Sequence, residues 1–195
     1  MRNENLKVFE KYVQDCQRLF CRAISNGPCK PLEKTPGSKG PVTTMQYVNN
    51  TLANQLDQDL NEVYLFHGTK KDRVEVLLQN GLDPRLANMN FAKLWLGSGV
   101  YAAEEANLSS RYTKADEQGV RTMFVMRVCL GDVFTTQNHM PELKRPPCKA
   151  RCQTTCTEHN EFFDSVVGEF GQREFVVYES AKCYPEYVIH YTFPK

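Results

Sequence analysis

A histidine and a glycine end a short apolar segment, VYLFHGT, at residues 63–69. Side chains alternate along a strand, so Val63, Leu65 and His67 are expected on one face. An imidazole there could hydrogen-bond a ligand, and Gly68 could admit a ligand to bare backbone or form a turn with positive φ. A histidine on a buried face is more often a core residue than a catalytic one. The segment alone favours that interpretation.

A carboxylate begins a second apolar segment, REFVVY, in which Glu174 shares a face with Val176 and Tyr178. Such a group either reaches solvent or takes part in chemistry, and a solvated strand end is the default for this residue alone. The segment GSGVYA fits the dinucleotide fingerprint G-x-G-x-x-G/A. The acids at the distance expected for a ribose contact, Asp116 and Glu117, lie in a predicted loop. The sequence therefore does not favour a parallel dinucleotide-binding unit.

Three cysteines and a histidine follow one another with the spacing C-x3-C-x3-C-x2-H: Cys148, Cys152, Cys156 and His159. Zinc favours four sulfur or nitrogen ligands, so the number of ligands is right. A second paired module is missing, and we therefore favour unrelated thiols on a loop over a zinc site. The same loop carries four basic residues, which predict a solvated face or a contact for an acidic partner: Lys144, Arg145, Lys149 and Arg151.

The elements that position these residues can be read from periodicity and turn signals. Helices are predicted at residues 5–24, 43–60, 70–80 and 104–113, and strands at 63–66, 121–134, 163–168, 173–180 and 187–193. The first helix is expected to bury Val8, Tyr12, Leu19 and Ile24. Because helices come first and strands dominate later, the order predicts an α+β fold with a mostly antiparallel sheet. We expect an N-terminal helix and linker, residues 1–41, packed on a domain of residues 42–195 as one globular unit.

The composition limits the class of partner. In 195 residues, 24 Lys+Arg nearly balance 23 Asp+Glu, so no strong attraction to nucleic acid or to an anionic membrane is expected. No apolar segment reaches the roughly 18 residues that a membrane-spanning helix needs, and no signal peptide is recognised at the N-terminus. Eight cysteines are too few for a disulfide scaffold. We expect an intracellular protein, cytoplasmic or nuclear, with free or metal-bound thiols.

Taken together, five segments in this order resemble the catalytic domain of the poly(ADP-ribose) polymerases, which are diphtheria-toxin-like ADP-ribosyltransferases. The segments are YLFHGT, LGSGVYAAEEANLSSRYT, FVMRVCLGDVF, FDSVVG and REFVVYESAKCYPEYVIHY. They extend over residues 62–193. The resemblance implies an ADP-ribosyltransferase fold, with a split, mostly antiparallel sheet around an NAD cleft. It makes the dinucleotide fingerprint a coincidence of glycines.

The resemblance also implies roles for particular residues. The catalytic His–Tyr–Glu triad of the family falls on His67, Tyr101 and Glu174. The residues expected to bind NAD+ are His67, Gly68, Thr69, Arg85, Gly99, Tyr101, Ser109 and Tyr112. Of these, Gly68 and Ser109 would bind the carboxamide of nicotinamide, Tyr112 and Tyr101 would enclose its ring, and His67 would bind the ribose on the adenosine side. Residues 83–93 would form the donor loop.

The implied reaction is cleavage of NAD+ and transfer of ADP-ribose to protein acceptors, including the protein itself. Elongation to poly(ADP-ribose) stays open, because members with Ile or Leu in place of the glutamate transfer a single unit and Glu174 is present here. An NAD+ glycohydrolase or an inactive binding module are the alternatives. The zinc site of the tankyrase branch lies in a different loop, so the resemblance adds nothing to zinc at the Cys-rich segment.

Overall fold

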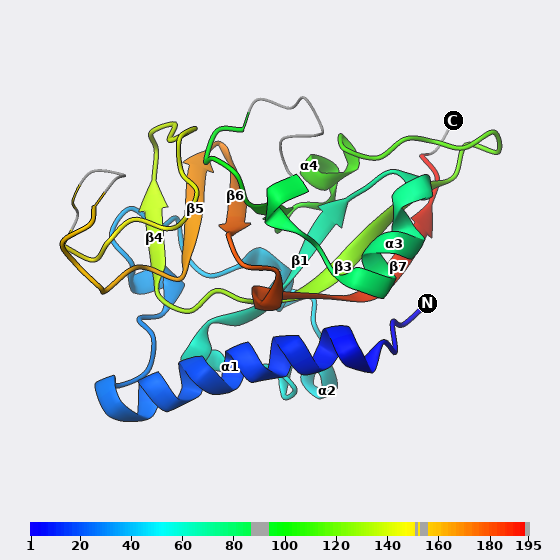
Figure 1. Ribbon diagram of the computed structural model, residues 1–195. Helices are drawn as coiled ribbons and strands as arrows, with labels where there is room; N and C mark the ends of the chain where they lie inside the picture. Colours follow the sequence, from blue (N-terminus) through cyan, green and yellow to red (C-terminus); the bar gives the residue numbers. More distant parts are fainter. Residues whose placement is uncertain (87–93, 151, 153–155, 194–195) are drawn as a thin grey trace.

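The computed structural model describes residues 1–86, 94–150, 152 and 156–193. They form a seven-stranded mixed sheet with the order β4-β5-β6-β2-β1-β3-β7, shown in Figure 1. The strands are β1 (Glu62–Gly68), β2 (Val100–Ala103), β3 (Arg121–Cys129), β4 (Val133–Thr136), β5 (Ser165–Phe170), β6 (Gln172–Val177) and β7 (Cys183–Tyr191). Neighbouring strands are antiparallel except β4 and β5, which are parallel. The expected α+β class with a mostly antiparallel sheet is confirmed.

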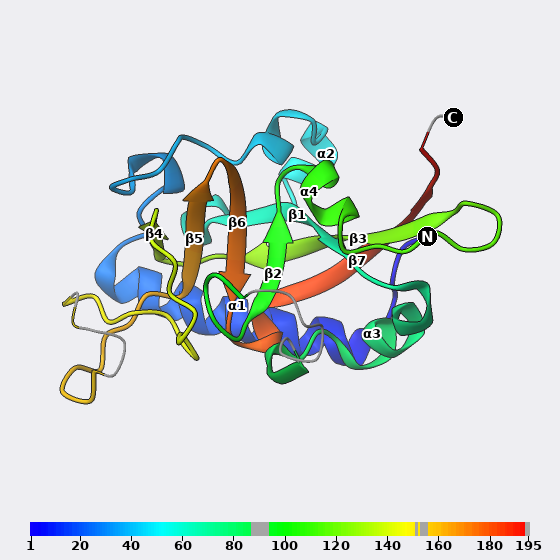
Figure 2. The same cartoon turned by 90° about the horizontal axis from the view of Figure 1, so that it is seen from above.

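The sheet is nearly divided between β1 and β2. Strand β1 pairs with β3 along residues 62–68, whereas β1 and β2 share the single registered pair Phe66↔Ala103. In Figure 2, strands β2, β5 and β6 run across the direction of β1, β3 and β7. The two halves of the sheet therefore diverge beside His67, the residue that follows this pair.

The longest helix, α1 (Leu6–Asn26), lies along one side of the sheet (Figure 1). The Asn5 side chain caps it by accepting a hydrogen bond from the Val8 amide. Its buried residues recur at intervals of three and four: Val8, Tyr12, Asp15 and Leu19. Ile24, expected on the same face, is 71% exposed. Five residues after Leu19, it is turned about 140° from the buried face, because each helical residue rotates by about 100°.

Helix α1 shares its buried cluster with residues from the rest of the chain. Leu60, Cys129 and Tyr184 pack in the same cluster as the buried face of α1. On the same face of α1, between Tyr12 and Leu19, the Asp15 carboxylate lies 3.3 Å from the Lys182 ammonium, and both groups are buried. On these contacts we propose that residues 1–41 and 42–195 fold as a single unit.

The predicted helix at residues 43–60 is wrong. In its place are two 3-10 helices, Thr43–Gln46 and Gln58–Leu60, and the short helix α2 (Asn50–Ala53). The Asn49 side chain accepts a hydrogen bond from the Leu52 amide, and the Asp57 side chain accepts one from the Asp59 amide. Asn and Asp side chains compete for backbone groups in this way, and so they interrupt a helix whose apolar spacing is otherwise regular.

Other elements also differ from the expected bounds, and the last strand, expected at residues 187–193, is Cys183–Tyr191. Residues 70–80 form a 3-10 helix, Lys71–Arg73, and then α3 (Val74–Asn80), which ends at Gly81 as expected. Helix α4 (Ala106–Ser110) is shorter than predicted. The predicted strand 121–134 is two strands, because Gly131 between β3 and β4 has a φ of 60°. Two further 3-10 helices are Leu32–Lys34 and Ser180–Lys182.

The main core joins both halves of the sheet. Its largest cluster of buried side chains includes Leu65 of β1, Phe124 of β3 and Phe175 of β6. Since the backbone ladder between β1 and β2 is a single pair, side-chain packing is what keeps the halves together there. Over the described part of the chain, no helix has the length and apolar character that crossing a membrane requires.

Candidate active site

His67 and Tyr101 face each other where β1 and β2 diverge. The His67 Nδ1 atom lies 2.7 Å from the carbonyl oxygen of Tyr101. A carbonyl oxygen only accepts, so Nδ1 carries the proton and Nε2 keeps a lone pair. Burial lowers the pKa of His67, and the bond to the Tyr101 carbonyl opposes that shift only in part. The structure thus supplies a neutral imidazole whose Nε2 can accept a hydrogen bond.

The Tyr101 ring is fixed by its own hydroxyl. That hydroxyl donates to the Gly97 carbonyl at 2.8 Å and accepts from the Leu96 amide at 2.9 Å. Burial raises the pKa of Tyr101, so the phenol stays neutral. The turn that holds it is packed tightly: Gly97 has a φ of 76°, and a Cβ there would lie 1.9 Å from the Leu143 carbonyl oxygen. Only glycine fits at this position.

Glu174 lies on β6, directly across from Ala103 of β2. The pairs Phe66↔Ala103 and Ala103↔Glu174 align three strands in one row, one residue from His67. The Glu174 carboxylate is half-buried and, within the described residues, has no hydrogen-bond or ion-pair partner. Burial raises its pKa, and the Arg111 guanidinium opposes the shift. A carboxylate in this condition is available to a bound molecule.

Helix α4 brings Ser109 and Tyr112 to the end of β1. A Cβ at Gly68 would lie 1.8 Å from the Ser109 carbonyl oxygen and 3.1 Å from Tyr112 Cβ. Gly68 is therefore needed for the close approach of α4, and its φ is not positive, so the turn considered in the sequence analysis is not its role. The Ser109 hydroxyl donates to the Phe66 carbonyl at 2.8 Å, which leaves its lone pairs for an N–H donor.

Tyr112 offers an aromatic face next to these groups. The residue is 47% exposed, unlike the buried Ser109. Burial of its inner part, and then the Glu174 carboxylate, raise the pKa of Tyr112; the same carboxylate contributes to the raised pKa of Tyr101. Both phenols therefore lie within electrostatic reach of Glu174. His67, Tyr101, Tyr112 and Glu174 form one group around the divergence of β1 and β2.

The remaining predicted residues are placed differently. Thr69 is buried beside Gly68. A Cβ at Gly99 would lie 2.3 Å from Val176 Cγ1, so this glycine permits close packing of the segment before β2 onto β6. The Arg85 side chain is 87% exposed and pairs with Asp83 at 2.6 Å, and no contact with the group around Glu174 is found in the described residues. Residues 87–93 of the predicted donor loop lie outside the described residues.

A buried ion pair that was not predicted from the sequence lies beside Glu174. Arg173 donates to both carboxylate oxygens of Glu104, at 2.5 and 2.6 Å, and to the carbonyls of Gly40 and Pro41. Glu104 was assigned to the first turn of a helix, but α4 begins two residues later. The signal available in the sequence was a pair of opposite charges: Glu104 ends one apolar segment, and Arg173 begins another. The pair locks β2 to β6 at the residue next to Glu174.

The four candidate metal ligands also come together. One ligand atom from each of Cys148, Cys152, Cys156 and His159 lies within 4.8 Å of all the others. These residues are on the connection between β4 and β5, whereas His67, Tyr101 and Glu174 are on β1, β2 and β6. The structure therefore contains two separate chemical groups, one at the β1–β2 divergence and one on this connection.

Comparison with known proteins identifies the family. The model of the poly(ADP-ribose) polymerase catalytic domain matches residues 29–193. Protein mono-ADP-ribosyltransferase PARP12 of Homo sapiens is 36% identical over 134 residues, which cover 68% of this chain and 17% of the relative. Protein mono-ADP-ribosyltransferase PARP14 of Homo sapiens is 29% identical over 202 residues, or 100% of this chain and 10% of the relative.

The poly(ADP-ribose) polymerase tankyrase of Caenorhabditis elegans is 37% identical over 79 residues, or 40% of this chain and 3% of the relative. The chain thus spans less than a fifth of the length of each of these three relatives. The family match covers all five segments on which the resemblance was based. This chain belongs to the poly(ADP-ribose) polymerase catalytic domain family.

Proposed function

We propose that this chain is an NAD+-dependent ADP-ribosyltransferase that releases nicotinamide and transfers ADP-ribose to protein acceptors, itself included. One observation carries the proposal: the Glu174 carboxylate is half-buried, has no hydrogen-bond or ion-pair partner among the described residues, and belongs to the same group as a neutral imidazole and two phenol rings where the sheet divides. The family supports it, and two relatives are named mono-ADP-ribosyltransferases.

The proposed chemistry assigns Glu174 to the bond that breaks. Nicotinamide leaves NAD+ by cleavage of a glycosidic bond, and positive charge develops on the ribose as in glycoside hydrolysis. A nearby carboxylate stabilises that charge more in the transition state than in the ground state. Because the Glu174 carboxylate is half-buried, its field is screened less than it would be in water. Glu174 also has its lone pairs free to accept hydrogen bonds from the nicotinamide ribose.

The other residues hold NAD+ in position. His67 Nε2 accepts a hydrogen bond from a hydroxyl of the adenosine-side ribose. The backbone of Gly68 binds the carboxamide of nicotinamide, and Ser109 Oγ accepts one of its N–H bonds. The rings of Tyr101 and Tyr112 stack on the nicotinamide, each adding about 1 kcal/mol. Fixing the ring in this way fixes the bond that must break.

The remaining assignments complete the proposal. Thr69 and Gly99 are assigned to the same site, and Arg85 is assigned to the adenosine part of NAD+. We place the reaction inside the cell, because all eight cysteines are free thiols in the structure and free thiols persist in reducing compartments. Nucleic acid is not proposed as an acceptor, because the net charge is only +1.

Elongation to a polymer is the second candidate, and Glu174 is the observation that favours it. A carboxylate free of partners can accept a hydrogen bond from a ribose that has already been transferred, and so prepare it as the next acceptor. Against it stand the relatives named as mono-ADP-ribosyltransferases. We therefore propose transfer to protein as the basic reaction and leave the number of units to be measured.

Incubation with labelled NAD+ and sizing of the products tests the proposal. We expect label on the protein or on an added acceptor, and loss of that label in Glu174→Gln. The matched control is Glu179→Gln, which changes an exposed glutamate just beyond the same strand. A single shifted band means one transfer, and a ladder means elongation. Soluble ADP-ribose without labelled protein would replace the proposal with an NAD+ glycohydrolase, and failure to bind NAD+ would reduce the chain to an inactive fold.

A further inference from the structure

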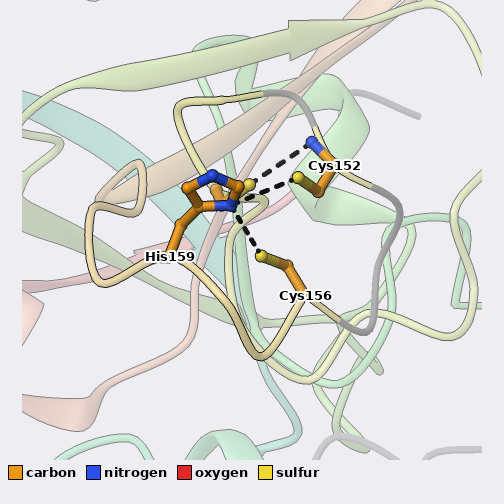
Figure 3. Close-up of side chains that lie close together, drawn as sticks. Cys152, Cys156 and His159 are labelled. Carbon is orange, nitrogen blue, oxygen red and sulfur yellow. Dashed lines mark hydrogen bonds between the residues drawn. The ribbon is translucent and has the colours of Figure 1, made fainter.

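Three sulfur atoms and one ring nitrogen converge on the connection between β4 and β5. Figure 3 shows His159 pointing at the thiols of Cys152 and Cys156, with its Nδ1 atom 3.3 and 3.2 Å from the two sulfurs. With Cys148 included, all four ligand atoms lie within 4.8 Å of one another. None of these cysteines is in a disulfide. The four atoms enclose one point without being bonded to each other.

These separations suit a tetrahedral zinc ion. With zinc–sulfur bonds of about 2.3 Å, neighbouring ligands of such an ion lie about 3.7 Å apart. The two separations from His159 Nδ1, 3.3 and 3.2 Å, are slightly shorter than that value, and 4.8 Å is the upper limit for the whole set. A set of three cysteines and one histidine fills all four positions, which is typical of structural zinc and leaves none for a substrate. Each interval between successive ligands holds two or three residues, within the range of zinc-binding pairs.

The scaffold fixes the first ligand and the two ends of the connection. Cys148 is 2% exposed. Its backbone forms an isolated antiparallel β-bridge with Phe162, in the part of the connection that leads into β5. The Lys149 amide donates to the Glu161 carbonyl at 2.8 Å, and the Phe163 amide donates to the Pro147 carbonyl at 3.0 Å. The two arms are therefore held together at their base. In the sequence, zinc was not favoured because a second pair of ligands on its own structural module is missing. Here the paired arms provide the support that such a module would give to the ligands.

Neighbouring donors complete the site. The Cys152 amide donates to the Cys148 sulfur at 3.3 Å, which orients that sulfur and stabilises a thiolate. The Arg145 guanidinium donates to the Cys156 carbonyl at 2.5 Å and lies 4.2 Å from the centre of the Phe162 ring. Three thiolates and a neutral imidazole leave bound zinc with a net negative charge, which this guanidinium offsets.

We infer that Cys148, Cys152, Cys156 and His159 bind one structural Zn²⁺ that clamps the connection between β4 and β5. The same connection reaches the turn that holds Tyr101: the Met140 amide donates to the Trp95 carbonyl at 2.6 Å, and the Ser98 amide donates to the Leu143 carbonyl at 2.8 Å. The metal thus stabilises a segment that supports the active-site turn without touching the substrate. The inference stands on these ligands and is independent of the reaction proposed above.

The test is the metal content of the whole chain. Protein purified without added metal, and protein refilled with zinc chloride under reducing conditions, should each hold about one zinc per chain by mass spectrometry of the metal. Cys152→Ser and His159→Ala should lose most of it. His159→Cys, which keeps four ligands, should retain it. Cys21→Ser, which changes an exposed cysteine on α1, is the matched control and should hold as much zinc as the parent chain.

Replacement of zinc by cobalt gives a second readout. The parent chain should show the visible bands of tetrahedral cobalt and a thiolate charge-transfer band in the near ultraviolet, and that band should strengthen in His159→Cys. The inference is overturned if refilled parent protein holds no zinc, or if Cys152→Ser and His159→Ala hold as much as Cys21→Ser. Circular dichroism checks the fold of each variant. If a variant does not fold, release of one zinc from the parent chain by a chelator decides the matter, and no release overturns the inference.

Discussion

The buried pair Glu104–Arg173 should contribute more to stability than any exposed ion pair of this chain. Arg173 and Glu104 are 4% and 8% exposed. Among the described residues, the variant Arg173→Ala leaves the carboxylate with Thr43, whose amide donates to it at 2.7 Å, and removes the donor from the carbonyls of Gly40 and Pro41. Breaking a buried pair by removing one partner costs about 3–5 kcal/mol, which lowers the melting temperature of a domain of this size by roughly 6–20 °C.

The experiment is a double-mutant cycle followed by urea and thermal denaturation. Arg173→Met and Glu104→Met each leave one buried charge alone, so each should be strongly destabilised. The double variant removes both charges and should be less destabilised than the sum of the two, by about 1–3 kcal/mol. Arg173→Lys keeps the charge but loses the planar fork that binds both carboxylate oxygens, and so should fall between parent and Arg173→Met.

An exposed pair supplies the control for this cycle. Lys71 and Asp116 form an ion pair at 2.7 Å, with the Lys71 side chain 62% exposed. Lys71→Ala should leave the melting temperature unchanged within error. Our assignment of a coupled buried pair would be wrong in either of two cases: if Arg173→Met had the same melting temperature as Lys71→Ala, or if the double variant were destabilised by the full sum of the two single changes.

The same pair predicts a pH dependence of stability. Burial alone would raise the pKa of Glu104, but the hydrogen bonds from Arg173 and Thr43 override it and hold the pKa below its usual value. A carboxyl whose pKa is lowered by folding stabilises the protein above its unfolded pKa, and that contribution is lost as the pH falls through the folded pKa. The parent chain should therefore lose more free energy of unfolding in acid than the double Met variant.

Three further predictions concern the site and its support. Gly68→Ala would put a Cβ 1.8 Å from the Ser109 carbonyl oxygen, so α4 must move and NAD+ affinity by calorimetry should fall at least tenfold; unchanged affinity would contradict the proposed contact. Burial lowers the pKa of His67 from its usual 6.5. The value of kcat/KM for NAD+ should therefore stay level as the pH falls through 6.5 and decline only at lower pH. A decline centred above pH 6.5 would rule out a neutral His67 imidazole. Burial would raise the pKa of Asp164, but the hydrogen bonds from Arg22 and nearby charge lower it. Arg22→Ala should therefore be less stable than the parent chain above pH 3.8, and the difference should shrink in stronger acid. Denaturation at several pH values checks this.

The fold class followed from the order of elements, and the errors came from local competition. The late strands were found near their true positions, because β-branched residues gather there and glycine separates them. A helix over residues 43–60 is favoured by the helical spacing of Met45, Val48, Leu52 and Leu56. Periodicity does not report the side-chain hydrogen bonds of Asn49 and Asp57, each of which begins a new short helix inside the predicted one.

The site residues were reached through the resemblance and not through their own chemistry. His67 alone looked like a core residue, and its tautomer depends on a carbonyl 34 positions away. The pair Glu104–Arg173 was missed, because it depends on the register of β2 with β6, which no local pattern contains. The Cys-rich segment supplied four candidate ligands, and the structure brings all four together. The β-bridge between Cys148 and Phe162, which joins the two arms of this segment, cannot be seen in the spacing of the residues.

The division of the sheet explains why so much of the site depends on contacts outside the strand ladder. A continuous ladder between β1 and β2 would place His67 against β2 and leave no room for a ligand. With the single pair Phe66↔Ala103, the two halves need other bonds to stay aligned. His67 supplies one to the Tyr101 carbonyl, and Ser109, which follows β2 in the chain, supplies one to the Phe66 carbonyl of β1. Residues of the candidate site, His67 and Ser109, thus also hold its two sides together.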